Sequence, residues 1–358
     1  MFVTGASGFV GRSLCVALRT AGHDVCALVR VRTPAAARER IEALGVRCVV
    51  GDLGDEESLA LAVRGSETVF HLAALRPRGA AEKDYERVNL IGTENLIDAA
   101  RRARVRRLVY LSDARVTAGN YHRDYVDESF PQPDRFLDPY SRSKALAEDL
   151  AIGTSGTAGM DGVALRPGLV WGADDSVLLP ELIRRRRDGT LALLSGGTRF
   201  APTTQIDNLV AALMLAAEKP GIGGNVYYVT DDERVTMRAF LGMLLRAAGV
   251  GPPRRRMPYP IAYARAFLTD KRAGTDGCAR ADVIQFGRAA FFNIKRARAE
   301  LGYAPTVSLR EGERSLTDWA RAVGGADRIV AGDVLQVPSD GAEWPRVASE
   351  REGGPAAR

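Results

Sequence analysis

Short apolar runs alternate with longer stretches of helical periodicity through the first half of the chain. The runs predict strands, and the periodic stretches between them predict helices that cover the strands. Regular alternation of this kind is typical of a parallel, doubly wound α/β sheet with right-handed crossovers. We expect the strands at Met1–Thr4, Asp24–Val29, Val46–Val50, Thr68–Leu72, Arg107–Leu111 and Val163–Leu165.

A glycine turn joins the first of these strands to the first helix. Residues 2–14 are Phe-Val-Thr-Gly-Ala-Ser-Gly-Phe-Val-Gly-Arg-Ser-Leu. Gly5 permits the tight turn, Gly8 lets backbone approach a pyrophosphate at the helix N-terminus, and Gly11 lets the helix pack close to the sheet. Since the turn lies between an apolar strand and the periodic helix Phe9–Ala21, it predicts a Rossmann-type dinucleotide site.

The pattern changes after Gly172, where helices are interrupted by short strands and Gly/Pro turns. We expect residues 1–172 to form the dinucleotide-binding domain, with some later segments returning to it. Residues 173–322 then form a smaller, mixed α/β C-terminal lobe for the substrate. Residues 323–358 are rich in Gly, Ala, Pro, Glu and Arg, which predicts a mobile tail.

Tyr140 and Lys144 are the candidate catalytic pair. The chain has five lysines against forty-five arginines, so a lysine four residues after a tyrosine is rarely expected by chance and indicates a role for the pair. Asp138 and Pro139 suit a helix start, and the spacing places both side chains on one face of that helix. There the ammonium can lower the pKa of the phenol, which can then pass a proton to a carbonyl oxygen.

The order of the motifs resembles the extended short-chain dehydrogenases/reductases, the NAD(P)-dependent epimerase/dehydratase superfamily. Later segments at residues 206–209, 226–231 and 299–305 extend the resemblance over about residues 1–322 and are most similar to the branch of 3β-hydroxysteroid dehydrogenases and sterol-4-carboxylate 3-dehydrogenases. The earlier motifs are Thr4–Gly11, Gly51–Leu53, His71–Ala74, Asn89–Thr93, Tyr140 with Lys144, and Leu165–Gly172.

The resemblance implies roles for residues that the periodicity does not single out. Asp52 would bond the adenine amino group, and Lys144 would bond the nicotinamide ribose. Other positions would line the nucleotide or its nicotinamide end. The expected cofactor-binding set is Gly5, Ser7, Gly8, Phe9, Val10, Gly11, Arg30, Arg32, Asp52, Leu53, Leu72, Ala73, Ala74, Asn89, Tyr140, Lys144, Pro167 and Gly168.

The end of the second strand predicts which cofactor is used. An acidic residue there would bond the adenosine ribose and exclude a 2′-phosphate, but the chain has Arg30 and Arg32 and no carboxylate. An arginine fork can pair with a phosphate, and Arg12 lies in the neighbouring helix. We therefore favour NADP(H), with NAD(H) as the alternative.

One position departs from the family pattern. Extended short-chain enzymes carry a Ser-Ser or Ser-Thr pair after the fifth strand, and its second hydroxyl donates to the substrate oxygen. Counting back from Val116 puts Asp113 at that hydroxyl position, with Ser112 one place early. An ionised carboxylate accepts hydrogen bonds but cannot donate one. A shifted loop could bring Ser112 into the site, Asp113 could be held protonated by burial, or the chemistry could differ from ketone reduction.

Several substrate classes stay open. Sugar-nucleotide enzymes of the superfamily place an arginine six residues before the Asp of a V-D-D segment, where this chain has Ala201, and Arg199 lies two residues too early. We expect an oxidoreductase that interconverts a ketone and a secondary alcohol on an apolar alicyclic or polyketide-like molecule. The alternatives are an epimerase or dehydratase with internally recycled cofactor, non-redox use of the pocket with Asp113 as acid/base, and a nucleotide-sensing scaffold. Aromatic side chains that would line an apolar pocket are Tyr259, Tyr263, Phe267, Phe286, Phe291 and Phe292.

Composition agrees with a globular enzyme. The 358 residues are 46% hydrophobic and 26% charged, which suits a substantial core. A net charge of +6 raises the question of nucleic-acid binding, but the basic residues are scattered and few aromatics lie among them, so we expect no nucleic-acid partner.

The four cysteines show no metal-like spacing, so we expect no metal, and no apolar run is long enough for a membrane span. The chain starts directly in a strand, which favours a cytoplasmic protein without a signal peptide, and family analogy favours a homodimer through helices near Ala81–Arg104 and Tyr140–Ala151.

Overall fold

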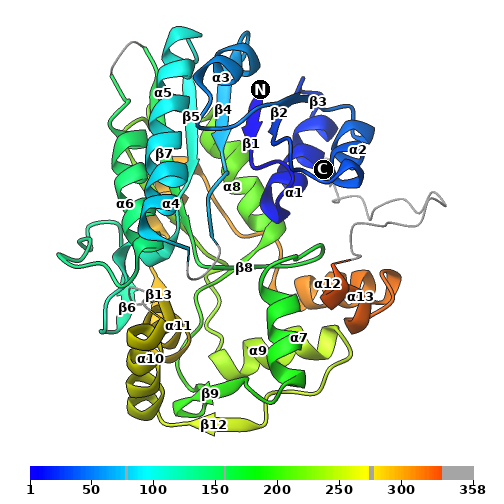
Figure 1. Cartoon of the computed structure of the whole chain (residues 1–358), viewed down its shortest axis with the longest axis vertical. Coiled ribbons are helices and arrows are strands. Elements are labelled where there is room, and N and C mark those ends of the chain that lie inside the picture. Colours follow the sequence, from blue (N-terminus) through cyan, green and yellow to red (C-terminus); the bar gives the residue numbers. More distant parts are fainter. Residues whose placement is uncertain (77–79, 157–158, 274–277, 333–358) are drawn as a thin grey trace, which may run out of the picture.

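A sheet of seven parallel strands forms the centre of the molecule (Figure 1). The computed structural model describes residues 1–76, 80–156, 159–273 and 278–332. The strand order is β11-β7-β5-β4-β1-β2-β3, and the predicted doubly wound α/β fold is confirmed. The strands are β1 (Phe2–Thr4), β2 (Cys26–Val29), β3 (Arg47–Val50), β4 (Thr68–His71), β5 (Arg107–Leu111), β7 (Asp161–Pro167) and β11 (Val226–Val229).

The six predicted strands all belong to this sheet, with ends within two residues of the expected ones. The seventh, β11, was not predicted as a strand, although its residues were part of the family resemblance. It enters the sheet beside β7 after the chain has passed through the first part of a smaller lobe. Its four residues are buried, because they close one edge of the sheet beneath covering helices.

Two layers of helices cover the sheet. Buried side chains of one layer form a core with Phe70, Val109 and Tyr227, and those of the other pack around Leu108 and Tyr110. The first layer contains α1 (Phe9–Thr20), α2 (Ala35–Ala43) and α8 (Ile206–Glu218). The second contains α3 (Glu56–Val63), α4 (Glu82–Tyr85), α5 (Gly92–Arg102) and α6 (Pro139–Ile152), with a π-helical turn, η1 (Glu86–Ile91), between α4 and α5.

Helix α6 begins where its sequence predicts. Asp138 is the N-cap residue, and its carboxylate accepts a hydrogen bond of 2.6 Å from the backbone N–H of Ser141. Pro139 occupies the first helical position, where its missing N–H costs nothing. This start places Tyr140 in the first turn, at the end of the helix that lies near the carboxyl ends of the strands.

A smaller lobe follows the sheet and has its own core around Trp171, Phe240 and Leu316. Three pairs of short parallel strands run through it or join it to the sheet domain: β8 (Leu169–Trp171) with β10 (Thr203–Gln205), β9 (Ala192–Leu194) with β12 (Arg255–Met257), and β6 (Arg123–Val126) with β13 (Ala290–Phe292). Its helices are α7 (Leu178–Arg187), α9 (Met237–Ala247), α10 (Tyr259–Ala273), α11 (Cys278–Gly287), α12 (Leu309–Ala322) and α13 (Ala326–Ala331). Three further short turns are η2 (Ala114–Thr117), η3 (Ser195–Gly197) and η4 (Ala297–Leu301).

Helix α13 lies in the segment for which we expected a mobile tail. Ile329 is buried there against the core of the lobe, and Asp327 forms an ion pair with Arg187 of α7. Residues 333–358, the rest of the expected tail, lie outside the described residues. Within the described helices, none has both the length and the apolar composition that a membrane crossing needs.

Gly168 joins the sheet to the lobe through a close backbone contact. A Cβ atom at this position would lie 2.1 Å from the carbonyl oxygen of Pro202, which is backbone and cannot move aside cheaply. The Gly168 N–H also donates to Thr204 Oγ1 at 2.9 Å. The glycine is therefore required where the chain passes from β7 to the β8–β10 pair.

Candidate active site

The glycine turn after β1 has the geometry of a dinucleotide cradle. Gly5 has φ +74°, and a Cβ there would lie 2.7 Å from the backbone nitrogen of Ala73. At Gly11 a Cβ would lie 2.2 Å from the Gly5 carbonyl oxygen, so helix α1 packs directly on the turn. No acidic residue occupies the first turn of α1, which leaves the positive end of its dipole available to a pyrophosphate. The residues present therefore fit a nicotinamide dinucleotide.

A buried polar chain holds the ends of β1 and β4 beside this turn. Thr4 Oγ1 lies 2.8 Å from His71 Nδ1, and His71 Nε2 lies 2.8 Å from Thr93 Oγ1. The same Thr4 oxygen accepts from the Ala73 N–H at 3.2 Å. Burial lowers the pKa of His71 to about 3, so the ring stays neutral and accepts one of these bonds. The sequence motifs contained these residues, but periodicity does not show that they bond to one another.

Asn89 supports the cofactor loop from behind. Its side chain is buried in η1; Oδ1 accepts from the Leu75 N–H at 2.6 Å, and Nδ2 donates to the Leu75 carbonyl and to Ser143 Oγ. These bonds use both amide hydrogens. Asn89 thus ties the segment after Ala74 to α6, and its predicted contact with the cofactor stays a prediction.

The remaining predicted cofactor residues are spread around the cradle. Leu72, Ala73 and Ala74 follow β4 and are half-buried. Asp52 is exposed and accepts from the Gly54 N–H at 2.9 Å, whereas Leu53 is buried in the second helix layer. The side chains of Phe9 and Val10 belong to the main core or pack against it, so an anion would meet their backbone N–H groups rather than their side chains.

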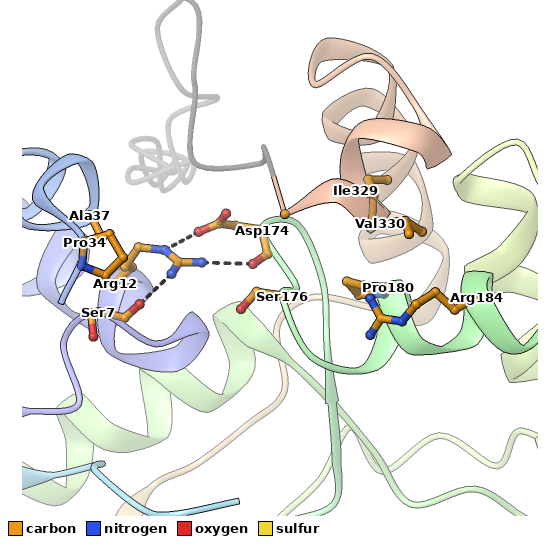
Figure 2. Close-up of a pocket in the computed structure, with 11 residues that line it drawn as sticks. Ser7, Arg12, Pro34, Ala37, Asp174, Ser176, Pro180, Arg184, Ile329 and Val330 are labelled. Carbon is orange, nitrogen blue, oxygen red and sulfur yellow. Dashed lines mark hydrogen bonds and ion pairs between the residues drawn. The ribbon is translucent and has the colours of Figure 1, made fainter. Parts of the chain in front are cut away.

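Arg30 and Arg32 are exposed at the end of β2, where the NADP(H) prediction needs them. Arg12 does not join them. It donates from Nε to Asp174 Oδ2 at 2.6 Å and from Nη1 to the Ser7 carbonyl at 2.8 Å (Figure 2). Its guanidinium is thus held between the glycine turn and the loop after β8.

This ion pair forms one wall of a pocket of about 290 Å³ (Figure 2). The pocket lies between the start of α1, the start of α2 and the first turns of α7, and Ile329 and Val330 of α13 close its far side. Neither Tyr140 nor Lys144 lines it. The pocket therefore borders the cofactor cradle and does not enclose the catalytic pair.

Lys144 lies one turn after Tyr140 on α6 and is buried. Its Nζ donates to the Leu111 carbonyl at the end of β5 at 2.6 Å and lies 4.0 Å above the Tyr110 ring. Burial lowers the pKa of Lys144 to about 7, although the carboxylates of Asp113 and Glu148 act in the opposite direction. The ammonium is thus held at the carboxyl edge of the sheet in a form that titrates near neutrality.

Asp113, not Ser112, meets the tyrosine. The Tyr140 hydroxyl donates to Asp113 Oδ2 at 3.1 Å, while Asp113 Oδ1 accepts from the Arg115 N–H at 2.9 Å. The Arg115 guanidinium lies 5.2 Å over the Tyr140 ring and bonds Asp138. Burial and, next, the charge of Asp113 raise the pKa of Tyr140. This direction is opposite to the one expected from Lys144.

Ser112 points to a different partner. Its hydroxyl donates to Glu148 Oε2 at 2.5 Å, and Glu148 in turn accepts from Arg166 Nε at 2.9 Å and from Arg166 Nη2 at 2.5 Å. The Glu148 side chain is 0% exposed. The loop shift that would bring Ser112 to the substrate is not found, because the buried ion pair binds its hydroxyl. Glu148 was not predicted, although its place four residues after Lys144 was a usable signal.

The aromatic residues expected to line a substrate pocket do not gather in one place. Phe292 is fully buried and stacks on Tyr228 with ring centroids 4.2 Å apart, whereas Phe267 is 49% exposed. Phe286 packs against the core of the lobe. Tyr259 and Tyr263 stack on each other at 6.0 Å along α10. Phe291 lies near two other aromatic rings, those of Tyr125 and Phe200.

The arrangement is suited to proton transfer at a carbonyl or hydroxyl oxygen. A buried phenol, a carboxylate and an ammonium meet where β5 and α6 come together, beside a cradle that fits a nicotinamide dinucleotide. Across the residues that the structure describes, no group of three or more His, Cys, Asp or Glu side chains is placed to hold a metal ion.

Comparison with known proteins agrees with this geometry. The profile of the 3-beta hydroxysteroid dehydrogenase/isomerase family matches residues 2–259. The chain belongs to this family. The predicted resemblance is thereby confirmed, and the protein is an NAD(P)-dependent enzyme of the short-chain dehydrogenase/reductase superfamily.

Members and structural neighbours of the family resemble almost the whole chain. The 4-hydroxy-2-methyl-3-oxo-4-farnesyl-3,4-dihydroquinoline-1-oxide ketoreductase of Stigmatella aurantiaca is 37% identical over 331 residues, 91% of this chain and 98% of that protein. The 2-alkyl-3-oxoalkanoate reductase of Shewanella oneidensis is 33% identical, over 88% of this chain and 84% of that protein. The structure of MoeE5 in complex with UDP-glucose and NAD has a TM-score of 0.70 and 28% identity, covering 89% of this chain and 98% of its own.

We predict that Ser112→Ala destabilises the protein and spares its chemistry. The substitution removes one hydrogen bond to a buried carboxylate, so the free energy of unfolding should fall by about 1–3 kcal/mol, measured by urea titration. The control is Ser129→Ala, since Ser129 bonds an exposed carboxylate, Asp127. A large loss of kcat for Ser112→Ala with unchanged stability would instead place the Ser112 hydroxyl at the reacting oxygen.

Proposed function

We propose that the protein is an NADP(H)-dependent oxidoreductase that interconverts a ketone and a secondary alcohol on an apolar alicyclic or polyketide-like small molecule. The observation on which this rests is the Tyr140 hydroxyl, held at the carboxyl end of β5 with Lys144 one turn further along the same helix. The names of two relatives, a ketoreductase and a 2-alkyl-3-oxoalkanoate reductase, support the reaction class, because each names a reductase of a compound that carries a 3-oxo group.

In reduction, Tyr140 supplies the proton that the carbonyl oxygen gains, and in oxidation it takes the proton from the hydroxyl. The raised pKa of Tyr140 keeps the phenol protonated at neutral pH, which suits the reductive direction. Lys144 lies one turn after Tyr140 on the same helix, and in this proposal its charge stabilises the tyrosinate left after the proton moves. The bound nicotinamide supplies or accepts the hydride.

An epimerase or dehydratase that recycles its cofactor internally is the second candidate. The carboxylate of Asp113 favours it, because a second acid/base group beside Tyr140 is what proton removal from carbon would require. The two candidates differ in cofactor consumption. A ketoreductase oxidises one NADPH per turnover, which lowers absorbance at 340 nm, whereas internal recycling leaves that absorbance constant.

Replacing Tyr140 by Phe should abolish turnover and leave cofactor binding intact. Loss of the general acid is expected to lower kcat by about 10²–10⁴-fold, measured with NADPH and bulky alicyclic ketones, while the dissociation constant of NADPH stays unchanged. Tyr303→Phe is the matched control, since Tyr303 is another buried tyrosine and its hydroxyl donates to a backbone carbonyl, that of Thr230. Retained turnover in Tyr140→Phe would contradict the assignment.

The preference for NADP(H) can be tested at Arg30 and Arg32. Both are exposed at the end of β2, where no carboxylate opposes a 2′-phosphate. Replacing both by Ala should weaken NADPH binding by about tenfold or more and leave NADH binding unchanged, as read by fluorescence titration. Arg38→Ala, which breaks an exposed pair with Glu42 on α2, is the control. Equal affinity of the wild type for both cofactors would refute the preference.

We further propose a homodimer, and the cytoplasmic location stays a prediction. The expected interface helices are α4 to α5, including η1, and α6, and each exposes a large apolar side chain: Ile91 is 48% exposed and Leu150 is 37% exposed. Apolar side chains exposed on both helices would be covered in such a dimer.

Light scattering should therefore give twice the chain mass of 38.6 kDa. The double substitution Ile91→Glu and Leu150→Glu should shift the protein to the monomer, because a dimer would bury both charges. Val16→Glu on α1, at a side chain also 37% exposed, should not change the mass. A wild-type monomer would overturn the proposed dimer.

A further inference from the structure

Asp113 places a hydrogen-bond acceptor where a reductase of this fold needs a donor. Its carboxylate lies 3.1 Å from the Tyr140 hydroxyl, so it borders the position that a ketone oxygen must take to receive the tyrosine proton. Ser112 cannot supply the missing donor, because its hydroxyl is bound to buried Glu148. If a substrate presented only its carbonyl oxygen to Asp113, two hydrogen-bond acceptors would face each other and no hydrogen bond could form between them.

The carboxylate has free capacity toward the substrate. Oδ1 accepts from the Arg115 N–H at 2.9 Å and Oδ2 from Tyr140, whereas a carboxylate has about four lone-pair positions. The side chain is half-buried, unlike that of Ser112, which is buried. Its orientation is set by the first turn of η2, for which Asp113 is the N-cap residue.

We propose that Asp113 selects substrates with a hydroxyl group on the carbon next to the reacting carbonyl, that is, α-hydroxy ketones. This inference rests on the proposed function. The substrate hydroxyl donates to Asp113 while the neighbouring carbonyl oxygen accepts from Tyr140. Two oxygens on adjacent carbons can lie at a separation close to that of the two protein oxygens, so both bonds form at once.

The reaction balances without a further reactant. The carbonyl carbon gains a hydride from NADPH, its oxygen gains the Tyr140 proton, and the products are a vicinal diol and NADP⁺. The neighbouring hydroxyl is not consumed. Asp113 is thus a binding and specificity residue in this step, and the proton on Tyr140 is replaced from solvent.

The charges around Asp113 make this binding mode tolerable for the developing alkoxide. The guanidinium of Arg115 lies over the Tyr140 ring and bonds Asp138, the N-cap of α6. A substrate hydroxyl that donates to Asp113 partly compensates the negative charge of the carboxylate, which would otherwise stand bare beside the reacting oxygen. A ketone without this hydroxyl leaves the carboxylate facing the alkoxide.

The test compares three bicyclic ketones of one shape with NADPH: 1-hydroxy-2-tetralone, 2-tetralone and 1-methoxy-2-tetralone. For the wild type we expect kcat/KM to be about tenfold or more higher for the hydroxy ketone than for the other two, since a site built to bond a hydroxyl rejects analogues that lack it. The methyl ether keeps the oxygen but cannot donate a hydrogen bond, so comparing it with the hydroxy ketone measures the effect of the donated bond alone.

Asp113→Ser is the informative variant. Serine can still cap the Arg115 N–H but is neutral and can donate to a ketone oxygen. We expect the ratio between hydroxy ketone and 2-tetralone to fall toward one, with 2-tetralone reduced faster than by the wild type. Asp124→Ser, at an exposed carboxylate on β6, is the control and should keep the wild-type ratio.

Each outcome separates the two levels of the proposal. Equal kcat/KM values for the three ketones in the wild type would overturn the role of Asp113 while leaving ketone reduction intact. A preference that persists in Asp113→Ser would also overturn it, because another group would then be reading the hydroxyl. No consumption of any ketone by protein that binds NADPH would overturn the proposed function, and the inference with it.

Discussion

The buried ion pair between Glu148 and Arg166 is the interaction on which the geometry of the active site depends. Arg166 belongs to β7 and Glu148 to α6, and the Ser112 hydroxyl at the end of β5 joins them. Two strands and the catalytic helix are thus held together at one point. Removing one member of such a pair typically costs about 3–5 kcal/mol, because the other charge is left buried and unpaired.

The same pair decides which residue contacts Tyr140. Since Ser112 is bound to Glu148, the next residue, Asp113, turns toward Tyr140. Lys144 donates to the Leu111 carbonyl, one residue before Ser112. The contact between Asp113 and the Tyr140 hydroxyl therefore depends on a salt bridge that includes neither residue.

The smaller lobe is joined to the sheet domain by close backbone packing and by hydrogen bonds. Gly168 lies against Pro202, and Trp171 Nε1 donates to Asp231 Oδ2 at 3.1 Å. On the cofactor side, Arg12 and Asp174 connect the glycine turn to the loop after β8 (Figure 2). Asp174 was not predicted, because nothing local in the sequence marks it as the partner of Arg12.

Local sequence determined the fold class, six of the seven strands, the glycine turn and the placement of Tyr140 and Lys144 on one helical face. These follow from side-chain periodicity, from turn chemistry and from a spacing of four, all of which act over a few neighbouring residues. Tertiary structure alone decided that β11 completes the sheet, that Asn89 supports a loop and that the Ser112 hydroxyl binds Glu148. It also decided that burial and, next, the charge of Asp113 raise the pKa of Tyr140. Each of these depends on partners at least 14 residues away along the chain, and a pKa or a hydrogen bond is set by which groups the packed fold brings together.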